Sequence, residues 1–338
     1  MGKRFVLNYQ GEQPERLDKV LARELPQFSR RELRRLILQG SVYVNRKRVR
    51  KQSFQISAGK PVRIIVYPFD GSTFDALAAK IDWHSRVLYR DEHLLALNKP
   101  AGIPTAPVLE SAVHNVYAYA QQAGVLPHHY YSFHRLDKGT TGVLLIPLRK
   151  KMAAALNQLT KTGEFQKRYW LIGKGNPPGD EWEVEGYLSS PVGNPRKVKF
   201  SGTPVSRYRR CLTRFRVLAV NKTQHLALIE AQPVTGRTHQ IRISMEVSGL
   251  TILGDPVYGN AAYGDAKTPM LLHCLEISFR YPVVKEHLTI RAKVGSTNDT
   301  NRHEVVKEHL TIRAPLPDAF LSRLQSSFPD IGREGGKD

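Results

Sequence analysis

Reactive side chains are densest in one stretch of the sequence, SFHRLDKGTTGVLLIP at residues 132–147. A polar turn carrying Asp137 runs straight into an apolar, strand-like run. A carboxylate fixed at a strand edge can serve as a nucleophile or a base, and the two glycines that follow would let other backbone approach it. The plainer alternative for an isolated HRLD motif is a surface ion pair between Asp137 and Arg135 or Lys138. A kinase catalytic loop is excluded, because its order is His-Arg-Asp and neither a Gly-rich loop nor a strand lysine precedes this stretch.

Further motifs accompany this stretch and favour a catalytic role for it. They are NKPAGIPT (98–105), QKRYW (166–170), PVTGRTHQIR (233–242), GDPVYG (254–259), LLHCLEISF (271–279) and APLPDAF (314–320). Together with HRLDKGTTGVLL at 134–145, these motifs resemble in order and spacing those of the RluA-type pseudouridine synthases. The resemblance covers residues 85–320 and implies an enzyme that isomerises uridine in RNA to pseudouridine.

The resemblance also implies where the active site lies. The aspartate nucleophile of the family falls on Asp137, its active-site tyrosine on Tyr169, and its carboxylate-paired arginine on Arg242. A second RLDK occurs at residues 16–19, but it lacks the Gly-Thr-Thr-Gly that follows the first, so we expect a structural role for Asp18.

Two arginines compete in the PVTGRTHQIR segment. If the segment is helical, Arg237 and Arg242 lie about 140° apart around the axis, so both cannot easily point at one carboxylate. His239 and Arg242 would share a face, and packing in the core is the alternative to a catalytic role for His239. Four side chains around the reacting groups are expected to contact RNA: His134, Arg135, Arg237 and His239.

The implied reaction cleaves the bond from ribose C1′ to uracil N1, rotates the base and joins C1′ to C5. It needs no redox change and no energy input, so no cofactor or metal is expected, and the sequence carries no P-loop, dinucleotide fingerprint or metal-ligand cluster. Asp137 would attack C1′ or remove a ribose proton, and the sequence leaves both routes open. Because a stacked duplex hides these atoms, the uridine must be everted. Tyr169 would stack on the everted base or assist proton removal at C5.

A strongly basic segment precedes these motifs. Lys and Arg outnumber Asp and Glu by 51 to 30 over 338 residues, a formal charge of +21, and residues 1–67 hold 16 of these basic residues against 5 acidic ones. An extended polyanion is the partner expected from such a charge. The stretch 15–49 resembles an S4 RNA-binding domain, which implies contact with structured RNA through phosphates. The side chains expected to make that contact are Arg30, Arg31, Arg34, Arg35, Arg46, Lys47 and Arg48.

The elements of this basic segment can be predicted from local patterns. Apolar residues recur at helical spacing over residues 15–25. A second helix is expected to begin at Ser29, which forms an S-x-x-E capping box with Glu32, and to end at Gly40. Valines then alternate with polar residues over 42–49 around a tight turn, a pattern typical of a hairpin.

Residues 68–84 are predicted to form a connector, and a strand-like run at 87–97 begins a second domain over 85–322, followed by a tail at 323–338. From there short β-type runs alternate irregularly with fewer helices. This pattern predicts an α+β fold with a mixed, largely antiparallel sheet, preceded by a small α/β S4-like domain.

Other features of the sequence bear on membrane association, redox compartment and oligomeric state. The chain lacks any run of about 18 apolar residues, so we expect no membrane partner. Cys211 and Cys274 stand far apart, without the spacing of a disulfide framework or a zinc site, which fits a reducing cytoplasm. The family resemblance implies a monomer.

The decapeptide VVKEHLTIRA occurs twice, at 283–292 and at 305–314. Two copies are too few for a repeat architecture, so we interpret the 22-residue period as a tandem duplication. Only one copy can occupy the original strand position, and the sequence does not decide which.

These observations predict an RNA pseudouridine synthase, and the S4-like segment favours large-subunit ribosomal RNA as its target. Two alternatives stay open. One is the same chemistry on transfer RNA, and the other is a non-catalytic RNA-binding or ribosome-assembly factor, although retention of Asp137, Tyr169 and Arg242 counts against the latter.

Overall fold

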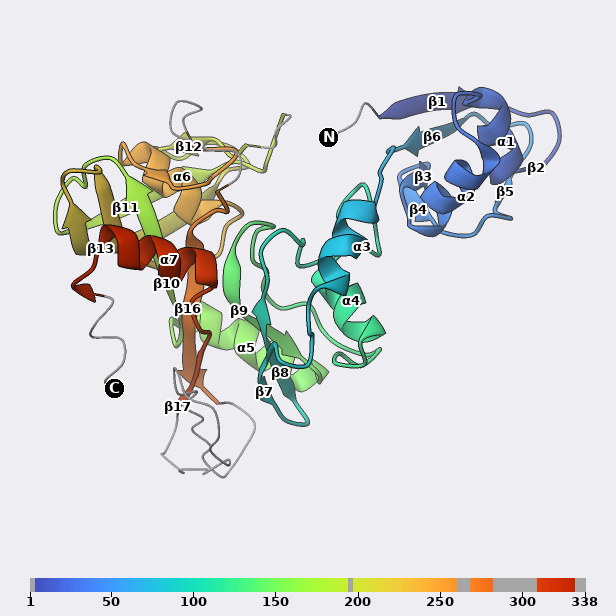
Figure 1. Ribbon diagram of the computed structural model, residues 1–338. Coiled ribbons are helices and arrows are strands. Elements are labelled where there is room, and N and C mark those ends of the chain that lie inside the picture. Colours follow the sequence, from blue (N-terminus) through green and yellow to red (C-terminus); the bar gives the residue numbers. More distant parts are fainter. Residues whose placement is uncertain (1–3, 194–196, 260–267, 282–308, 332–338) are drawn as a thin grey trace. The chain divides into compact units, whose positions relative to one another are not determined.

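The computed structural model describes residues 4–193, 197–259, 268–281 and 309–331. The chain forms two compact units (Figure 1). The N-terminal unit contains residues 1–82 and 103–123, and the C-terminal unit contains 83–102 and 124–338. The segment 103–123 therefore groups with the N-terminal unit, although the sequence had suggested that it belongs to the second domain.

Two helices packed on a small sheet form the first part of the N-terminal unit. The helices are α1 (Leu17–Glu24) and α2 (Arg30–Leu38), and the sheet has the order β1 (Phe5–Tyr9), β6 (Val62–Val66), β3 (Val42–Val44) and β4 (Lys47–Val49). The predicted capping box and hairpin are confirmed: Ser29 and Glu32 satisfy each other's backbone N–H groups, and Asn45 and Arg46 take positive φ at the turn. The first helix begins at Leu17 because Glu15–Arg16 (β2) pairs with Gln55–Ile56 (β5).

The predicted connector contains a helix, α3 (Ser72–Ala79). The carboxylate of Asp70 accepts hydrogen bonds from the backbone N–H and the hydroxyl of Ser72, which satisfies one N–H of the first turn, while the N-cap residue Gly71 provides no side-chain cap. The Tyr119 hydroxyl of α4 (Val116–Gln122) donates to Asp75 of α3 at 2.8 Å. The segment predicted as a connector thus contains a helix whose first turn is bound by Asp70.

The C-terminal unit is built on one eleven-stranded sheet with the order β12-β11-β13-β14-β10-β16-β9-β8-β7, on which β15 pairs with β10 and β17 with β16. All its pairings are antiparallel except that of β16 with β9. The predicted α+β fold with a mixed, largely antiparallel sheet is confirmed. The strands are β7 (Val87–Arg90), β8 (Leu94–Lys99), β9 (Thr141–Pro147), β10 (Phe165–Lys174), β11 (Glu181–Leu188), β12 (Phe200–Ser201), β13 (Arg209–Asn221), β14 (Leu226–Pro233), β15 (Thr251–Ile252), β16 (Leu272–Arg280) and β17 (His309–Arg313).

The predicted single run at 87–97 is a hairpin of β7 and β8. The Asp91 carboxylate makes the turn, because it accepts the backbone N–H groups of His93 and Leu94, both at 2.7 Å. The following strand, β9, is buried along its whole length and lies between β8 and β16.

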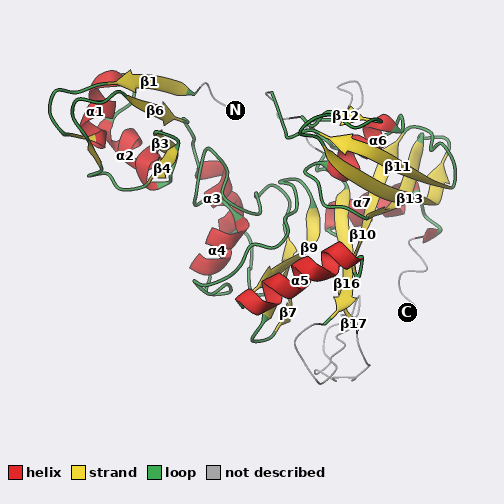
Figure 2. Ribbon diagram, turned by 180° about the vertical axis from the view of Figure 1, so that it is seen from behind, coloured by secondary structure: helices red, strands yellow, loops and turns green. Residues whose placement is uncertain are grey.

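Three helices cover this sheet: α5 (Lys150–Thr162), α6 (Gln240–Val247) and α7 (Asp318–Ser327). Helix α7 lies in front of the sheet in Figure 1, and α5 lies in front of it in Figure 2, which shows the opposite side. On β10, Ile172 packs in the cluster with Phe320 of α7, whereas a Cβ at Gly173 would lie 2.9 Å from Met245 of α6. Since successive residues of a strand face opposite sides, Tyr169 shares the α6 face and Trp170 the α7 face.

The close approach of β9 to β16 requires a glycine. Gly142 has a φ of +105°, and a Cβ there would lie 2.1 Å from the carbonyl oxygen of Cys274. The expectation that glycines after Asp137 let other backbone approach is confirmed at this position. Beside it, Thr141 Oγ1 lies 2.7 Å from His273 Nδ1, and His273 Nε2 lies 3.2 Å from the carbonyl oxygen of Ala314.

The strand β17 comes from the second copy of the duplicated decapeptide. His309–Arg313 pairs with β16 from Arg280 to Glu276. The first copy lies outside the described residues. No helix in the described ranges combines the length and the apolar composition that crossing a bilayer demands.

The buried ring of His273 makes stability depend on pH. Burial lowers the pKa of His273 to about 4 from 6.5, so the unfolded chain takes up the proton first. Above about pH 6.5 the neutral His273 ring makes its full contribution to the free energy of unfolding. That contribution, about 3 kcal/mol, is lost as the pH falls from 6.5 towards 4. We therefore expect His273→Asn to lose less stability than the wild type between pH 7 and 4 in urea unfolding. His129→Gln, at an exposed position, should keep the full dependence; equal slopes for His273→Asn and wild type would contradict this assignment.

Candidate active site

A buried lysine binds the backbone of the turn that carries Asp137. Lys99 is 0% exposed, and its ammonium donates to the carbonyl oxygens of Pro100, Lys138 and Thr140 at 2.9, 3.2 and 3.0 Å. Burial lowers the pKa of Lys99 to about 7, and the negative charge of Asp137 opposes this shift. The backbone N–H of Thr140 closes the turn on the Asp137 carbonyl at 3.1 Å. The lysine thus fixes the backbone that presents the carboxylate.

His134 holds the other end of the same segment to the sheet. Its Nε2 accepts the backbone N–H of Leu145 at 2.8 Å, and its ring contacts Phe133 and Phe165. Burial lowers the pKa of His134 to about 3, so the ring is neutral and able to accept that hydrogen bond. These contacts favour a structural role over the predicted contact with RNA, which stays a prediction.

Helix α6 positions Arg242, which is 5% exposed. The helix begins after His239, which has a φ of +58°, and Gln240 ties its first turn to β13 through Leu212 and Thr213, both at 3.0 Å. From this fixed start Arg242 reaches Asp137, with Nη1 at 3.0 Å from Oδ2. The predicted pairing of these two residues is what the structure shows.

A second carboxylate, Asp255, fixes the direction of the Arg242 side chain. Arg242 Nε and Nη2 donate to its two oxygens at 2.6 and 2.7 Å, and the backbone N–H groups of Val257 and Tyr258 donate to Oδ1. Burial raises the pKa of Asp255, but the hydrogen bonds and charge of Arg242 outweigh burial and hold the pKa below its usual value. Asp255 is therefore an ionised anchor behind the guanidinium.

His239 and Tyr258 border the carboxylate. His239 Nε2 lies 3.9 Å from Asp137 Oδ2, and its Nδ1 lies 3.0 Å from the Tyr258 hydroxyl. Burial lowers the pKa of His239, with Asp137 opposing and Arg242 reinforcing the shift. The Arg242 guanidinium stands 5.0 Å from the centre of the Tyr258 ring, within cation–π range. His239 and Arg242 both face Asp137, although His239 precedes α6 and the helical spacing used in the prediction does not apply to it.

Tyr169 reaches the same place from β10, where it is 7% exposed. Burial raises the pKa of its phenol well above the ordinary value, and Cys274 and Asp137 reinforce the rise. Its partner on β16 is Cys274, whereas Arg168 pairs with Glu276, so Leu275 is an extra residue in a β-bulge. The bulge places the buried Cys274 thiol beside the phenol as a hydrogen-bond partner.

The structure thus brings together a carboxylate, a guanidinium that holds it and a neutral phenol. Asp137 keeps 18% of its side chain exposed, against 6% for Arg242 and 0% for Asp255, so its carboxylate is the group a substrate can reach. A guanidinium donor at 3.0 Å holds the carboxylate in place, and a carboxylate oxygen can attack carbon or accept a proton. The described residues contain no group of three or more His, Cys, Asp or Glu side chains suited to a metal ion.

Sequence reasoning assigned no role to Lys99, Asp255 or Tyr258. All three lie in motifs that it singled out, NKPAGIPT and GDPVYG. Their types gave no signal, because an aspartate before a proline and a lysine before a proline are ordinary turn residues. Their roles follow only from their contacts in the fold: Lys99 binds the turn that carries Asp137, Asp255 binds Arg242, and Tyr258 contacts His239.

The remaining predicted side chains near this site differ in exposure. Arg135 is exposed and close enough to lower the pKa of His239, after burial and the other charges. Arg237 is also exposed and donates from Nε to the Arg210 carbonyl at 3.1 Å. Arg237 lies before α6, so the helical geometry used to choose between the two arginines does not apply, although Arg242 is the one that pairs with Asp137.

In the N-terminal unit, the predicted basic side chains are mostly exposed. This holds for Arg30, Arg31, Arg34, Arg35, Arg46 and Lys47. Arg48 is different, because it donates to the carbonyl oxygens of Gly40 and Val108 at 2.8 and 2.5 Å. In the same unit Asp18 pairs with Arg16 at 2.8 Å, in line with the structural role expected for it.

Comparisons with known proteins bear on both units. The family model described as RNA pseudouridylate synthase matches residues 93–247, and that of the S4 domain matches 15–62. The chain is 30% identical over 301 residues to the ribosomal large subunit pseudouridine synthase C of Vibrio cholerae, with 82% of this chain and 89% of the relative covered. It is 29% identical to an uncharacterized RNA pseudouridine synthase of Bacillus subtilis, with 82% and 90% covered.

A solved structure shares the fold. Human RNA Pseudouridylate Synthase Domain Containing 4 superposes with a TM-score of 0.53 at 22% identity and covers 75% of this chain and 96% of its own. The resemblances noted in the sequence are thereby confirmed.

The geometry predicts different stability costs for the two carboxylates. Asp255→Asn leaves a buried guanidinium half paired, so we expect a loss of about 3 kcal/mol in the free energy of unfolding. Asp137→Asn weakens a single hydrogen bond at a partly exposed group and should cost less than about 1 kcal/mol. Urea unfolding of the full chain near pH 7 measures both. Equal losses would show that Asp255 does not anchor Arg242.

Proposed function

The chain belongs to the RNA pseudouridylate synthase family, and we propose that it converts selected uridines of large-subunit ribosomal RNA to pseudouridine with Asp137 as the reacting carboxylate. The observation that carries this assignment is the 3.0 Å contact of Asp137 with Arg242 at the end of the guanidinium that Asp255 does not occupy.

Asp137 acts on the ribose of an everted uridine. Its carboxylate either forms a bond to C1′ as the bond to N1 breaks, and leaves again when C5 attacks C1′, or it removes a ribose proton so that the base is released by elimination, and returns that proton as C1′ joins C5. In both routes C5 then loses its proton and N1 gains one. The site adds no atoms and changes no oxidation state, so the reaction is an isomerisation that side chains alone can catalyse.

Arg242 and Tyr169 support this chemistry in different ways. Arg242 holds the Asp137 carboxylate in a fixed direction, because its other donors are fixed on Asp255. Tyr169 presents a neutral phenol from a rigid strand, which suits stacking on the base and transfer of a proton at C5. His239, between Asp137 and Tyr258, would contact the substrate rather than titrate, since its lowered pKa keeps it neutral.

Two observations support ribosomal RNA as the target. The S4 domain presents a face of exposed arginines on α2, suited to phosphates of structured RNA. Similar proteins that span the same length include several named for the ribosomal large subunit. We propose a monomer that acts in the cytoplasm, where ribosomes assemble, and needs neither a cofactor nor a membrane.

Transfer RNA is the alternative substrate. Mapping pseudouridines in RNA from cells with and without the gene distinguishes the two, because a missing modification in large-subunit RNA supports the proposal and one confined to transfer RNA contradicts it.

The role of Asp137 can be tested against a matched control in the same chain. Asp137→Asn should lower pseudouridine formation by at least about 10³-fold, because an amide can neither attack C1′ nor remove a ribose proton, while RNA binding survives. Tritium release from C5-labelled uridine measures the rate. Asp18→Asn alters the other RLDK sequence and should leave the rate unchanged. Turnover near wild type in Asp137→Asn would remove this residue from its role.

The S4 contribution can be tested by charge removal. Replacing Arg30, Arg31, Arg34 and Arg35 by Gln should weaken RNA binding and reduce the slope of log K against log salt by about 0.7–0.9 for each phosphate that the variant no longer neutralises. A filter-binding titration from low to moderate salt measures it. The control replaces three exposed lysines of α5, Lys150, Lys151 and Lys161, by Gln. An unchanged slope in the α2 variant would refute the role of this face.

A further inference from the structure

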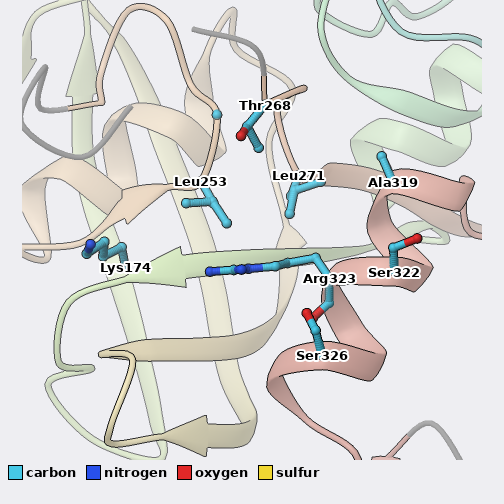
Figure 3. Close-up of a pocket in the computed structure, with 9 residues that line it drawn as sticks. Lys174, Leu253, Thr268, Leu271, Ala319, Ser322, Arg323 and Ser326 are labelled. Atoms are coloured by element: carbon cyan, nitrogen blue, oxygen red, sulfur yellow. The ribbon is translucent and has the colours of Figure 1, made fainter. Parts of the chain in front are cut away.

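A cavity of about 440 Å³ lies between α7, the end of β10 and the segments around Leu253 and Thr268, all in the C-terminal unit (Figure 3). It belongs to the α7 face of β10, opposite Tyr169, because Lys174 alternates with the residues of the catalytic face. The residues that line it are Lys174, Leu253, Gly254, Thr268, Leu271, Ala319, Ser322, Arg323 and Ser326.

Helix α7 offers the cavity one continuous stripe of side chains. Ala319, Ser322, Arg323 and Ser326 recur at helical spacing, so they share one face. The apolar stripe beside it, with Phe320 and Leu324, packs into the core. The polar stripe is therefore held rigidly over the cavity by the packing of its neighbours.

Arg323 lies across the cavity with an unused donor. Figure 3 shows its side chain extending from α7 towards β10 and Lys174. Its Nε is buried and has no hydrogen-bond partner among the residues that the structure describes. A buried charged N–H without an acceptor costs free energy, and native structures usually supply an acceptor from a side chain, a water or a ligand.

The lining makes the cavity positively charged. Arg323 and Lys174 each contribute a cation, and the nine lining residues include no Asp or Glu. The hydroxyls of Thr268, Ser322 and Ser326 add neutral donors. Five donor side chains exceed what the two oxygens of a carboxylate can accept, whereas a phosphate offers three or four oxygens and a higher charge.

We propose that this cavity binds a phosphate group, which accepts two parallel hydrogen bonds from Nε and Nη of Arg323. The planar guanidinium matches phosphate oxygens in this way, and Lys174 adds a point charge. Leu253 and Leu271 form an apolar wall, against which the organic part of a phosphate ester can lie. The site is separate from the reacting groups, since Arg323 contacts none of Asp137, Tyr169 or Arg242.

The phosphate can come from two sources, a free phosphate or small phosphate ester, or the backbone of bound RNA. Both place the same group on the same donors. The inference does not depend on the proposed function, because it concerns binding at residues that the reaction does not use.

The test is thermal unfolding of the full chain with added inorganic phosphate at constant ionic strength. At about ten times the dissociation constant, phosphate should raise the Tm of the wild type by about 3 °C. Arg323→Gln should weaken phosphate binding by about tenfold or more, and Arg323→Lys should retain part of it. Arg280→Gln, at an exposed arginine outside the cavity, should behave like the wild type.

Should Arg323→Gln fail to fold, Lys174→Gln and Ser322→Ala serve in its place. A short oligoadenylate, which contains no uridine, separates the sources: an Arg323-dependent rise in Tm with oligoadenylate assigns the site to RNA backbone, and a rise with inorganic phosphate alone assigns it to small ligands. No rise with phosphate in the wild type, or an equal rise in Arg323→Gln, overturns the proposal. At saturating RNA, pseudouridine formation by Arg323→Gln should match the wild type whichever source supplies the phosphate, so failure here is distinguishable from failure of the proposed function.

Discussion

The active site depends on how one guanidinium is shared. Arg242 places Nε and Nη2 on the buried carboxylate of Asp255 and has Nη1 left for Asp137. The first pairing is bidentate and shielded from water, so it sets the direction in which the remaining N–H points. Asp255 is in turn fixed by the backbone N–H groups of Val257 and Tyr258. The turn that contains Asp255 therefore fixes Arg242, and Arg242 in turn fixes Asp137, which is the more exposed of the two carboxylates.

The sheet supplies the second constraint, because the groups around Asp137 come from distant parts of the chain. Lys99 ends β8 and holds the turn before β9, while Tyr169 comes from β10 two strands away. The parallel contact of β9 with β16 joins these halves, and it exists because Gly142 allows the Cys274 carbonyl to approach. Packing thus fixes the distances that the chemistry needs before any RNA binds.

Local signals in the sequence predicted local structure well. The capping box at Ser29 and the turn at Asn45 depend on residues within a few positions of each other, and the structure has both. Motif resemblance predicted the pairing of Asp137 with Arg242. The anchors Asp255 and Lys99 were not predicted, because their partners are chosen by the tertiary fold and not by spacing. For the same reason the sequence could not show which of the two identical decapeptides occupies the strand position, and in the structure the second copy supplies β17.

The β-bulge at Leu275 breaks the two-residue alternation of β16 at the point where the strand passes the active site. Cys274 and Glu276 would share a face of a regular strand, yet one meets the Tyr169 phenol and the other meets Arg168 and Arg313 on the reverse side. Deleting that single residue would make Cys274 and Glu276 sequence neighbours, which alternation still directs to opposite sides, so each would keep its partner. An in-frame loss of one codon there would thus straighten the strand without moving either side chain across the sheet, whereas a regular strand that kept Leu275 would carry the Glu276 carboxylate to the phenol.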